Sequence, residues 1–341
     1  MTITKPQNAT LIDSISEGYG AINRRLWLVL IPLALNLYLW FGTQLSLAPL
    51  ITSIANTLKS VNPAIANQGD MPAVYDQFLA TGGLDLRQQL AVLNYIPTLR
   101  LYVVGATDSN ASAGLPAIPE VLQLINTQRT DTIQIATFGG ALLAFLIINA
   151  LALALSAIFL GQVGAAVRRD WSPAVGLRRA TKIGLSLLGA VAIIIGVGLA
   201  LGLPVLFFAT LLLYLNQTLG ILALIVVYWV GIWISIYIGF TAEAIVISGL
   251  GPLRAIYTSF NVVRRNVWGT LGFLALTLVI QLGSGVIWHS LVNTMIGAII
   301  AMVASAYIGS GVLAARMAFY RERLRRWQSA PAQPPGLRAR N

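Results

Sequence analysis

Long uncharged apolar runs separated by short polar segments dominate the pattern of this chain. No Asp, Glu, Lys or Arg occurs in 26–58, 132–167, 183–242 or 266–315. A transmembrane helix needs about 20 apolar residues, because the hydrocarbon core is about 30 Å thick and each residue rises about 1.5 Å. The first two runs therefore predict one span each. The last two, each interrupted by polar residues, predict a hairpin of two spans each.

The predicted fold class is all-α, a polytopic membrane bundle of six transmembrane helices. Helices are favoured because lipid leaves backbone groups no other partner outside a closed barrel, and the runs lack the alternation of barrel strands. The predicted spans are 26–47, 132–163, 183–206, 217–241, 268–290 and 295–316. The segments between them are an N-terminus at 1–25, a partly helical extracytoplasmic loop at 48–131, a basic loop at 164–182, an interfacial segment at 242–267 and a disordered basic tail at 317–341.

Composition and charge place the chain in a membrane and not on a nucleic acid. Hydrophobic residues make up 57% of the chain and charged residues only 10%, against about 25% charged in soluble domains. The net charge of +11 is typical of nucleic-acid binders, but the basic residues border the apolar spans. The sequence therefore predicts the lipid bilayer and its anionic lipids as partners, excludes nucleic acid, and leaves open a second membrane protein.

Most lysines and arginines fall on one side of the predicted spans. They concentrate in 1–25, 164–182, 242–267 and 317–341, whereas most acids lie in 48–131. The positive side of a membrane protein faces the cytoplasm. The sequence therefore predicts a bacterial inner-membrane protein with both termini in the cytoplasm.

A short amphipathic stretch with a double arginine precedes three of the predicted spans, at 14–25, 172–182 and 251–266. Helices of this kind lie flat in the membrane interface with their basic face toward the headgroups. The chain therefore reads as three units of interfacial helix plus helical hairpin, which either duplication or the shared needs of a span entering from the cytoplasm would produce. The predicted headgroup contacts are Arg24, Arg25, Arg178, Arg179, Arg264 and Arg265.

The residue types needed for most catalytic and metal sites are missing from this sequence. The chain has no cysteine and a single histidine, His289. This excludes thiolate metal sites, a cysteine nucleophile and paired-histidine zinc or haem sites, and no GxxxxGK[ST] loop is present. The sequence predicts no catalytic residue, no metal ligand, no cofactor and no enzyme activity.

Glu243 is the one acid between Lys182 and Arg316, and it lies near the inner end of the predicted fourth span. An ionisable residue at membrane depth is a functional candidate. Glu243 is thus a candidate functional acid that would pair with Arg264 or Arg265 or hold a headgroup. The alternative is an interfacial acid in water or in a structural ion pair.

Other polar and small residues inside the spans have two readings each. Asn36, Asn149 and Gln281 would line a polar path or hydrogen-bond between helices, and His289 would carry protons or bond at the interface. Small residues at every fourth position let helices approach closely. This spacing predicts a helix-packing face on the sixth span, formed by Gly297, Ala301, Ser305 and Gly309.

The stretch at 238–276 carries a resemblance to a known group of proteins. It combines an acid ending one span, a glycine-containing turn, an Ala-x-x-x-Ser interfacial helix, two arginines and an aromatic opening the next span. These features stand at Glu243, Gly249 or Gly251, Ala255 with Ser259, Arg264 with Arg265, and Trp268. The pattern resembles the membrane domain found beside glycerophosphodiester phosphodiesterases. The resemblance implies a fold and a membrane location, and it supplies no catalytic residues.

A second resemblance is shorter. Glu243, Ala244 and Gly249 are similar to the start of the cytoplasmic loop by which importer permeases contact an ATPase. Ile245 and the lack of a following proline depart from that pattern.

The function predicted is a non-enzymatic scaffold or partner-binding subunit that contacts anionic lipids. The alternatives are a transporter or permease component, which needs a hydrated polar cavity near mid-membrane, and a membrane-embedded lipid enzyme.

Overall fold

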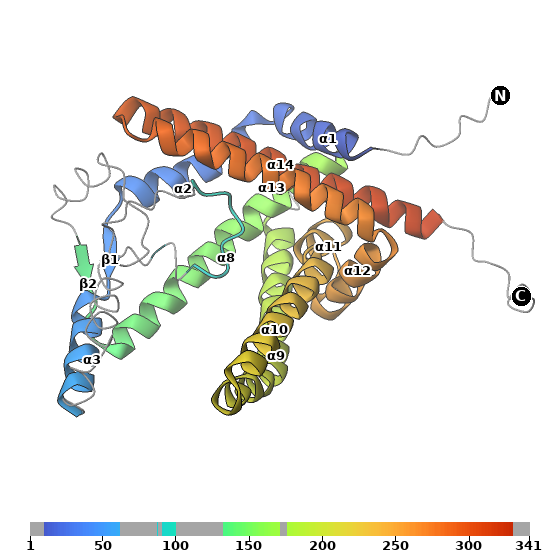
Figure 1. Ribbon diagram of the computed structural model, residues 1–341. Coiled ribbons are helices and arrows are strands. Elements are labelled where there is room, and N and C mark those ends of the chain that lie inside the picture. Colours follow the sequence, from blue (N-terminus) through green and yellow to red (C-terminus); the bar gives the residue numbers. More distant parts are fainter. Residues whose placement is uncertain (1–9, 62–86, 88–90, 100–131, 171–175, 330–341) are drawn as a thin grey trace, which may run out of the picture. The chain divides into compact units, whose positions relative to one another are not determined.

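A computed structural model describes residues 10–61, 87, 91–99, 132–170 and 176–329 (Figure 1). The described residues are mainly helical, which confirms the predicted all-α class. Five helices are long and apolar enough to cross a membrane, and a bent pair near the N-terminus makes a sixth if it is counted as one span. The chain divides into two compact units, unit 1 (Met1–Arg25, Leu160–Thr277 and Gly311–Asn341) and unit 2 (Leu26–Phe159 and Leu278–Ser310).

Unit 1 is built around a helical hairpin and two short helices that follow it. The hairpin consists of α9 (Gly176–Leu215) and α10 (Gln217–Ile238), which lie side by side in Figure 1. Asn216 turns the chain between them, because its side-chain oxygen accepts a hydrogen bond from the N–H of Leu219 at 3.2 Å and so caps α10. The other elements of unit 1 are α1 (Leu11–Asn23), α11 (Thr241–Ser248), α12 (Pro252–Arg265), the end of α8 (Phe138–Arg168), the start of α13 (Val267–Leu291) and the end of α14 (Met295–Ser329).

The core of unit 1 is aromatic. Phe240, Phe273 and Phe319 are fully buried, and the rings of Phe273 and Phe319 stack with centroids 4.4 Å apart. The ring of Tyr320 stacks with that of Phe240, with centroids 6.5 Å apart. These residues join the start of α11 and the start of α13 to the end of α14.

The α9–α10 hairpin leaves large apolar side chains exposed along most of its length. Phe207, Phe208, Tyr228 and Trp229 are among the most exposed. A soluble protein cannot leave a continuous apolar surface of this size in water. The hairpin therefore has the surface of a membrane protein.

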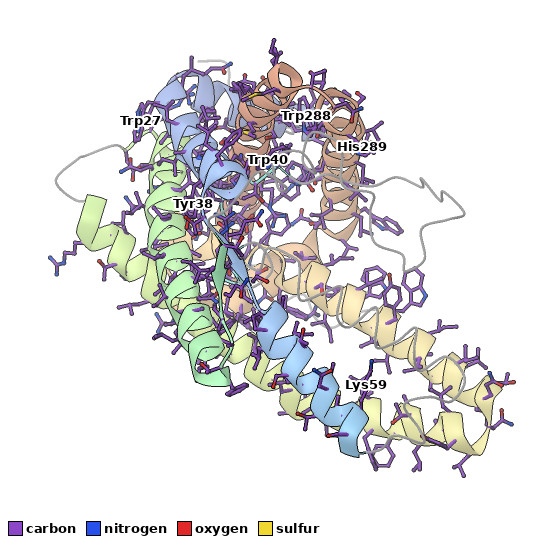
Figure 2. The ribbon with its side chains drawn as sticks, turned by 90° about the vertical axis from the view of Figure 1, so that its left-hand side faces the viewer. Trp27, Tyr38, Trp40, Lys59, Trp288 and His289 are labelled. Carbon is purple, nitrogen blue, oxygen red and sulfur yellow. The ribbon has the colours of Figure 1, made fainter. Side chains whose placement is uncertain are left out.

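Unit 2 contains the aromatic residues Trp40 and Trp288, which Figure 2 labels and which share one buried cluster. Ala301 and Met302 of α14 complete the centre of this cluster. The described elements of unit 2 are the 3-10 helix η1 (Leu26–Val29), α2 (Leu30–Phe41), β1 (Gln44–Ser46), α3 (Ala48–Val61), an irregular segment at 91–99, β2 (Thr132–Gln134) and the remaining parts of α8, α13 and α14.

The first two predicted spans differ from the structure at the ends next to the 48–131 loop. α2 ends at Phe41 and not at residue 47, and at roughly 1.5 Å per residue its 12 residues reach about 18 Å, short of a full crossing. Gly42 leaves the helix in an extended conformation. The strands β1 and β2 then pair in parallel, so α8 begins at Phe138 and not at residue 132.

Two other helices are longer than predicted. α9 includes the basic stretch at 178–182 and continues through Pro204 to Leu215, so this stretch is the start of a span and not a separate interfacial helix. α14 continues to Ser329, so the predicted disordered tail is helical over 317–329. Burial of Phe319 and Tyr320 explains the extension. The first residues of the chain, most of the 48–131 loop and residues 330–341 lie outside the described residues.

Candidate functional site

Positive charge gathers in unit 1. Apart from Lys59 and Arg87, every lysine and arginine of the described residues belongs to this unit. The sequence distributes these residues over four segments, and the fold collects them at the ends of α1 and α8, the start of α9, along α12 and at the end of α14. The acids described in unit 1 are fewer, namely Asp13, Glu17, Asp170, Glu243 and Glu322.

The helix α12 presents two different faces. Its small residues, among them Ala255 and Ser259, are buried against α9, α10 and α11. Its opposite face carries an apolar stripe of three exposed side chains at helical spacing, Leu253, Tyr257 and Phe260. Tyr257 is 67% exposed. The exposed arginines Arg254, Arg264 and Arg265 flank this stripe.

A helix with aromatic and apolar side chains next to arginines on its free face is typical of membrane interfaces. In helices of this kind the apolar side chains enter the acyl boundary while the guanidinium groups stay among the headgroups. The sequence predicted this helix as interfacial. The structure adds that its second face is used for packing within unit 1.

Glu243 is paired with an arginine from the end of α14. Glu243 is only 2% exposed, and its Oε1 lies 2.5 Å from Nε of Arg316. The same arginine donates from Nη2 to the carbonyl oxygen of Gly239 at 2.6 Å and lies over the ring of Phe240. A buried carboxylate requires such a partner, because an unpaired charge out of water is very costly.

The predicted partners Arg264 and Arg265 are therefore not the residues that neutralise Glu243. Both lie on the exposed side of α12. The second oxygen of Glu243, Oε2, is buried without a hydrogen bond among the described residues. The arrangement is the structural ion pair that the sequence left as an alternative.

Ser259 holds the break between α10 and α11. Its hydroxyl donates to the carbonyl oxygen of Tyr237 at 2.8 Å and accepts from the N–H of Phe240 at 3.1 Å. These two backbone groups lie where one helix ends and the next begins, so they lack helical partners. The serine of the Ala-x-x-x-Ser pattern is thus a capping residue at this helix break.

A second arginine network joins α1, α8, α11 and α14 within unit 1. Arg168 donates from Nη1 to the carbonyl oxygen of Val246 at 2.6 Å and from Nε to Asp170 at 2.9 Å. Arg321 donates to the carbonyl oxygen of Val167 and to the carboxylate of Glu17. These arginines also place a positive charge at the C-terminal ends of α8 and α11, where the helix dipole is negative. Several basic residues of unit 1 therefore have structural roles and are not free to bind lipid.

The six arginines predicted to contact headgroups occupy different environments. Arg179 is paired with Asp170 at 3.4 Å, and the guanidinium of Arg265 lies 5.1 Å from the ring centroid of Trp327. Arg25 is partly buried. The exposed members are Arg24, Arg178, Arg264 and Arg265.

An open groove of about 490 Å³ lies where the first turns of α9 meet the start of α12. Gly189 makes this meeting close, because a Cβ added there would lie 2.7 Å from Cγ of Pro252. The sequence did not predict this groove. Its lining residues are Arg178, Thr181, Lys182, Leu185, Ser186 and Pro252.

Polar residues of unit 2 bond to the irregular segment at 91–99. Oδ1 of Asn36 accepts from the N–H of Leu99 at 2.7 Å, and Oδ1 of Asn149 accepts from the N–H of Leu93 at 3.1 Å. These buried amides therefore satisfy backbone groups that no helix or sheet satisfies. Gln281 is exposed, so the three residues predicted for a polar path do not share one environment.

The small residues of α14 contact different neighbours. A Cβ on Gly309 would lie 2.4 Å from Cβ of Pro97, and Ala301 is buried in the cluster of the two tryptophans. Gly297 meets the turn between α13 and α14, and the Ser305 hydroxyl bonds a carbonyl of its own helix. The close approach at Gly309 is thus to the irregular segment at 91–99 and not to another helix.

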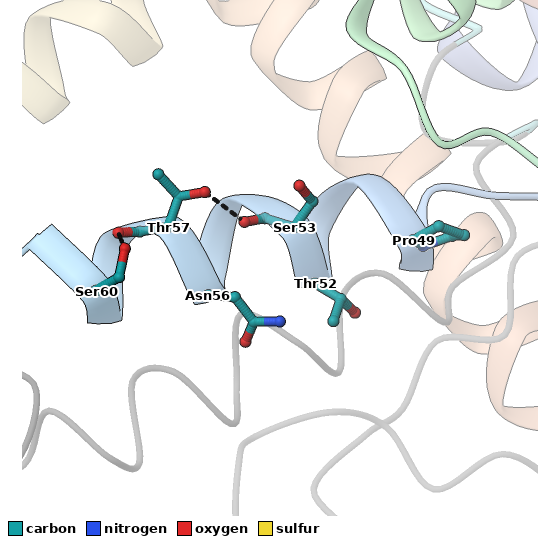
Figure 3. A pocket seen from close by; sticks show the side chains of 6 residues that line it. All are labelled: Pro49, Thr52, Ser53, Asn56, Thr57 and Ser60. Carbon is teal, nitrogen blue, oxygen red and sulfur yellow. Dashed lines mark hydrogen bonds between the residues drawn. The ribbon is translucent and has the colours of Figure 1, made fainter.

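A second groove, of about 550 Å³, follows one side of α3 (Figure 3). The hydroxyls of Thr57 and Ser60 donate to carbonyl oxygens of their own helix. No charged side chain of the described residues lines it. We assign it no function. Its lining residues are Pro49, Thr52, Ser53, Asn56, Thr57 and Ser60.

The described residues contain no group of three or more His, Asp or Glu side chains able to hold a metal ion. His289, labelled in Figure 2, is half-buried on α13, and its Nδ1 has no hydrogen-bond partner among those residues. Comparison with family models, curated proteins and solved structures finds no match to this chain. The two sequence resemblances therefore stay predictions, and function rests on the geometry of unit 1.

Proposed function

We propose that this protein is a non-enzymatic scaffold of a bacterial inner membrane whose unit 1 binds anionic phospholipids. In this proposal both termini and the basic ends of the helices lie on the cytoplasmic side, where a positive charge excess belongs. The observation that carries it is the free face of α12. There an apolar stripe lies beside three exposed arginines. Anionic headgroups would pair with the arginines, and the acyl chains below them would cover the stripe.

The proposal predicts that Arg264 and Arg265 strengthen binding to phosphatidylglycerol. Each basic residue near an anionic surface contributes roughly 1 kcal/mol, and 1.4 kcal/mol is tenfold in affinity. The double variant Arg264→Gln/Arg265→Gln loses roughly 2 kcal/mol and is therefore expected to bind phosphatidylglycerol about thirtyfold more weakly. Native mass spectrometry of the full chain in detergent, titrated with phosphatidylglycerol or with phosphatidylcholine, measures this change.

Two control variants separate charge from position. Arg264→Lys/Arg265→Lys keeps both charges and is expected to keep most of the binding, and Lys59→Gln removes a charge from unit 2 and is expected to change nothing. Added salt is expected to reduce the difference, because exposed charges are screened within about 10 Å at 0.1 M. Equal phosphatidylglycerol binding by the Gln double variant and the parent contradicts the proposal.

A further inference from the structure

The groove between the start of α9 and the start of α12 holds four features that together fit one chemical group. Arg178 and Lys182 lie one helical turn apart on α9, so both cations line the same wall. No carboxylate of the described chain forms an ion pair with either of them. Two cations without acidic partners at one groove favour an anion.

The second feature is the hydroxyl of Ser186. This side chain is only 8% exposed, it lines the groove, and no part of the chain that the structure describes makes a hydrogen bond to it. Its oxygen is not among the fully enclosed, unpartnered polar atoms of the described residues, so it is open to the groove that it lines. A bound acceptor oxygen in the groove would receive its hydrogen bond.

The third feature is the N-terminus of α12. Gly251 occupies its capping position and has no side chain to bond the first turn, and Pro252 begins the helix at the wall of the groove. The first turn of a helix exposes N–H groups and the positive end of the helix dipole. This end of α12 therefore adds a positive field to the two cations.

The fourth feature is apolar. Leu185 lines the groove and is 65% exposed, and the exposed Leu188 follows it one turn along α9. A free anion makes no favourable contact with this apolar surface, whereas the acyl chains of a lipid would cover it. The groove thus continues from a cationic wall to an apolar helix face.

We infer that the groove is a specific site for the phosphodiester of one anionic phospholipid. Arg178 and Lys182 bind the phosphate oxygens, Ser186 donates to one of them, and an acyl chain lies along Leu185 and Leu188. This site deepens the proposed function, and it rests on the proposal that unit 1 meets anionic lipid. It goes beyond the general attraction of α12, because it predicts one saturable lipid that is bound more tightly than the rest.

The test counts lipids on the full chain. Delipidated protein is titrated with phosphatidylglycerol, and native mass spectrometry measures the affinity of the first lipid bound. Lys182→Gln is expected to weaken this first lipid about fivefold to tenfold. Ser186→Ala is expected to weaken it about threefold, since it removes one hydrogen-bond donor with little change of shape. The matched control is Arg179→Gln, which removes one charge from α9 at a residue that pairs with Asp170 outside the groove, and it is expected to leave the first lipid unchanged.

Each outcome decides the question. If Lys182→Gln and Arg179→Gln weaken the first lipid equally, the attraction is general and the site is overturned. If Lys182→Gln and Ser186→Ala have no effect while Arg264→Gln/Arg265→Gln does, the groove fails and the proposed function survives. If the groove variants act and the α12 variant does not, the groove survives and the α12 proposal fails. Displacement of the first lipid by 10 mM inorganic phosphate identifies a free-anion site and overturns the lipid assignment.

Discussion

Replacing Arg316 with glutamine is expected to lower the free energy of unfolding by roughly 3–5 kcal/mol, the cost of leaving a buried charge without its partner. Glu243 is 2% exposed, and Arg316 is the residue that pairs with it. The same substitution also removes the hydrogen bond to the carbonyl oxygen of Gly239. Thermal unfolding of the purified protein in detergent at pH 7 measures the loss.

Two further variants give this prediction its control and its rescue. Arg325→Gln removes an exposed arginine from the same helix and is expected to change stability by less than about 0.5 kcal/mol. The double variant Glu243→Gln/Arg316→Gln removes both charges and is expected to recover most of the loss, because no ion is then left unpaired. An Arg316→Gln variant as stable as Arg325→Gln would show that Glu243 does not depend on this pair.

Gly18→Ala is expected to destabilise unit 1 by about 1–3 kcal/mol through overpacking. A Cβ on Gly18 would lie 2.3 Å from the backbone nitrogen of Ala315 and 2.4 Å from its Cα. Backbone atoms cannot move aside as a flexible side chain can, so α1 has to separate from α14. The melting temperature in detergent is expected to fall.

Gly20→Ala is the matched control on the same helix. The nearest atom to its Cβ would be the flexible Nη1 of Arg24, at 3.7 Å. Glycine in a helix is about 0.5–1 kcal/mol less favourable than alanine, so this variant is expected to raise stability slightly. Opposite signs at Gly18 and Gly20 identify the contact with α14, and a stabilising Gly18→Ala would contradict it.

The sequence was sufficient for features that depend on local pattern. Uncharged runs of the right length predict the long helices, and the polar residues around Asn216 predict the break between α9 and α10. The amphipathic pattern of 251–266 predicts α12. In each case one helix and its solvent, whether lipid or water, decide the structure.

Features that depend on distant partners were missed for a physical reason. Glu243 was identified as a candidate functional acid near the end of a span, but its partner Arg316 follows 73 residues later, and nothing local distinguishes Arg316 from Arg264. The pairing of β1 with β2 likewise joins short segments that have no strong pattern of their own. Asn36 was noted as polar, yet only the fold shows that it bonds the backbone of Leu99.

The groove illustrates the same limit. The spacing of Arg178 and Lys182 by one helical turn was a usable signal for a shared cationic wall. The contribution of Pro252 depends on the close packing of α12 against Gly189, which the sequence does not reveal. The sequence placed most basic residues on one side of the predicted spans, but their division into ion pairs and free cations needs the tertiary contacts.

The depth of α12 in the membrane is the most direct test of the account, and the absence of cysteine makes single labelling sites simple to introduce. Spin labels are placed by Leu253→Cys, Tyr257→Cys and Phe260→Cys in protein reconstituted into phosphatidylglycerol-containing bilayers. Collision with oxygen and with a nickel chelate then reports each depth. Labels at Leu188→Cys and Leu199→Cys on α9 provide a scale, because 11 residues of a spanning helix differ in depth by up to about 16 Å.

The account predicts that the three labels on α12 lie at one common depth, just below the headgroups, while the two labels on α9 differ. A helix that entered the bilayer would instead give a steady gradient from Leu253 to Phe260, approaching about 10 Å over seven residues. Such a gradient, or three labels fully exposed to water, would contradict the placement of the basic surface of unit 1 in the headgroup layer.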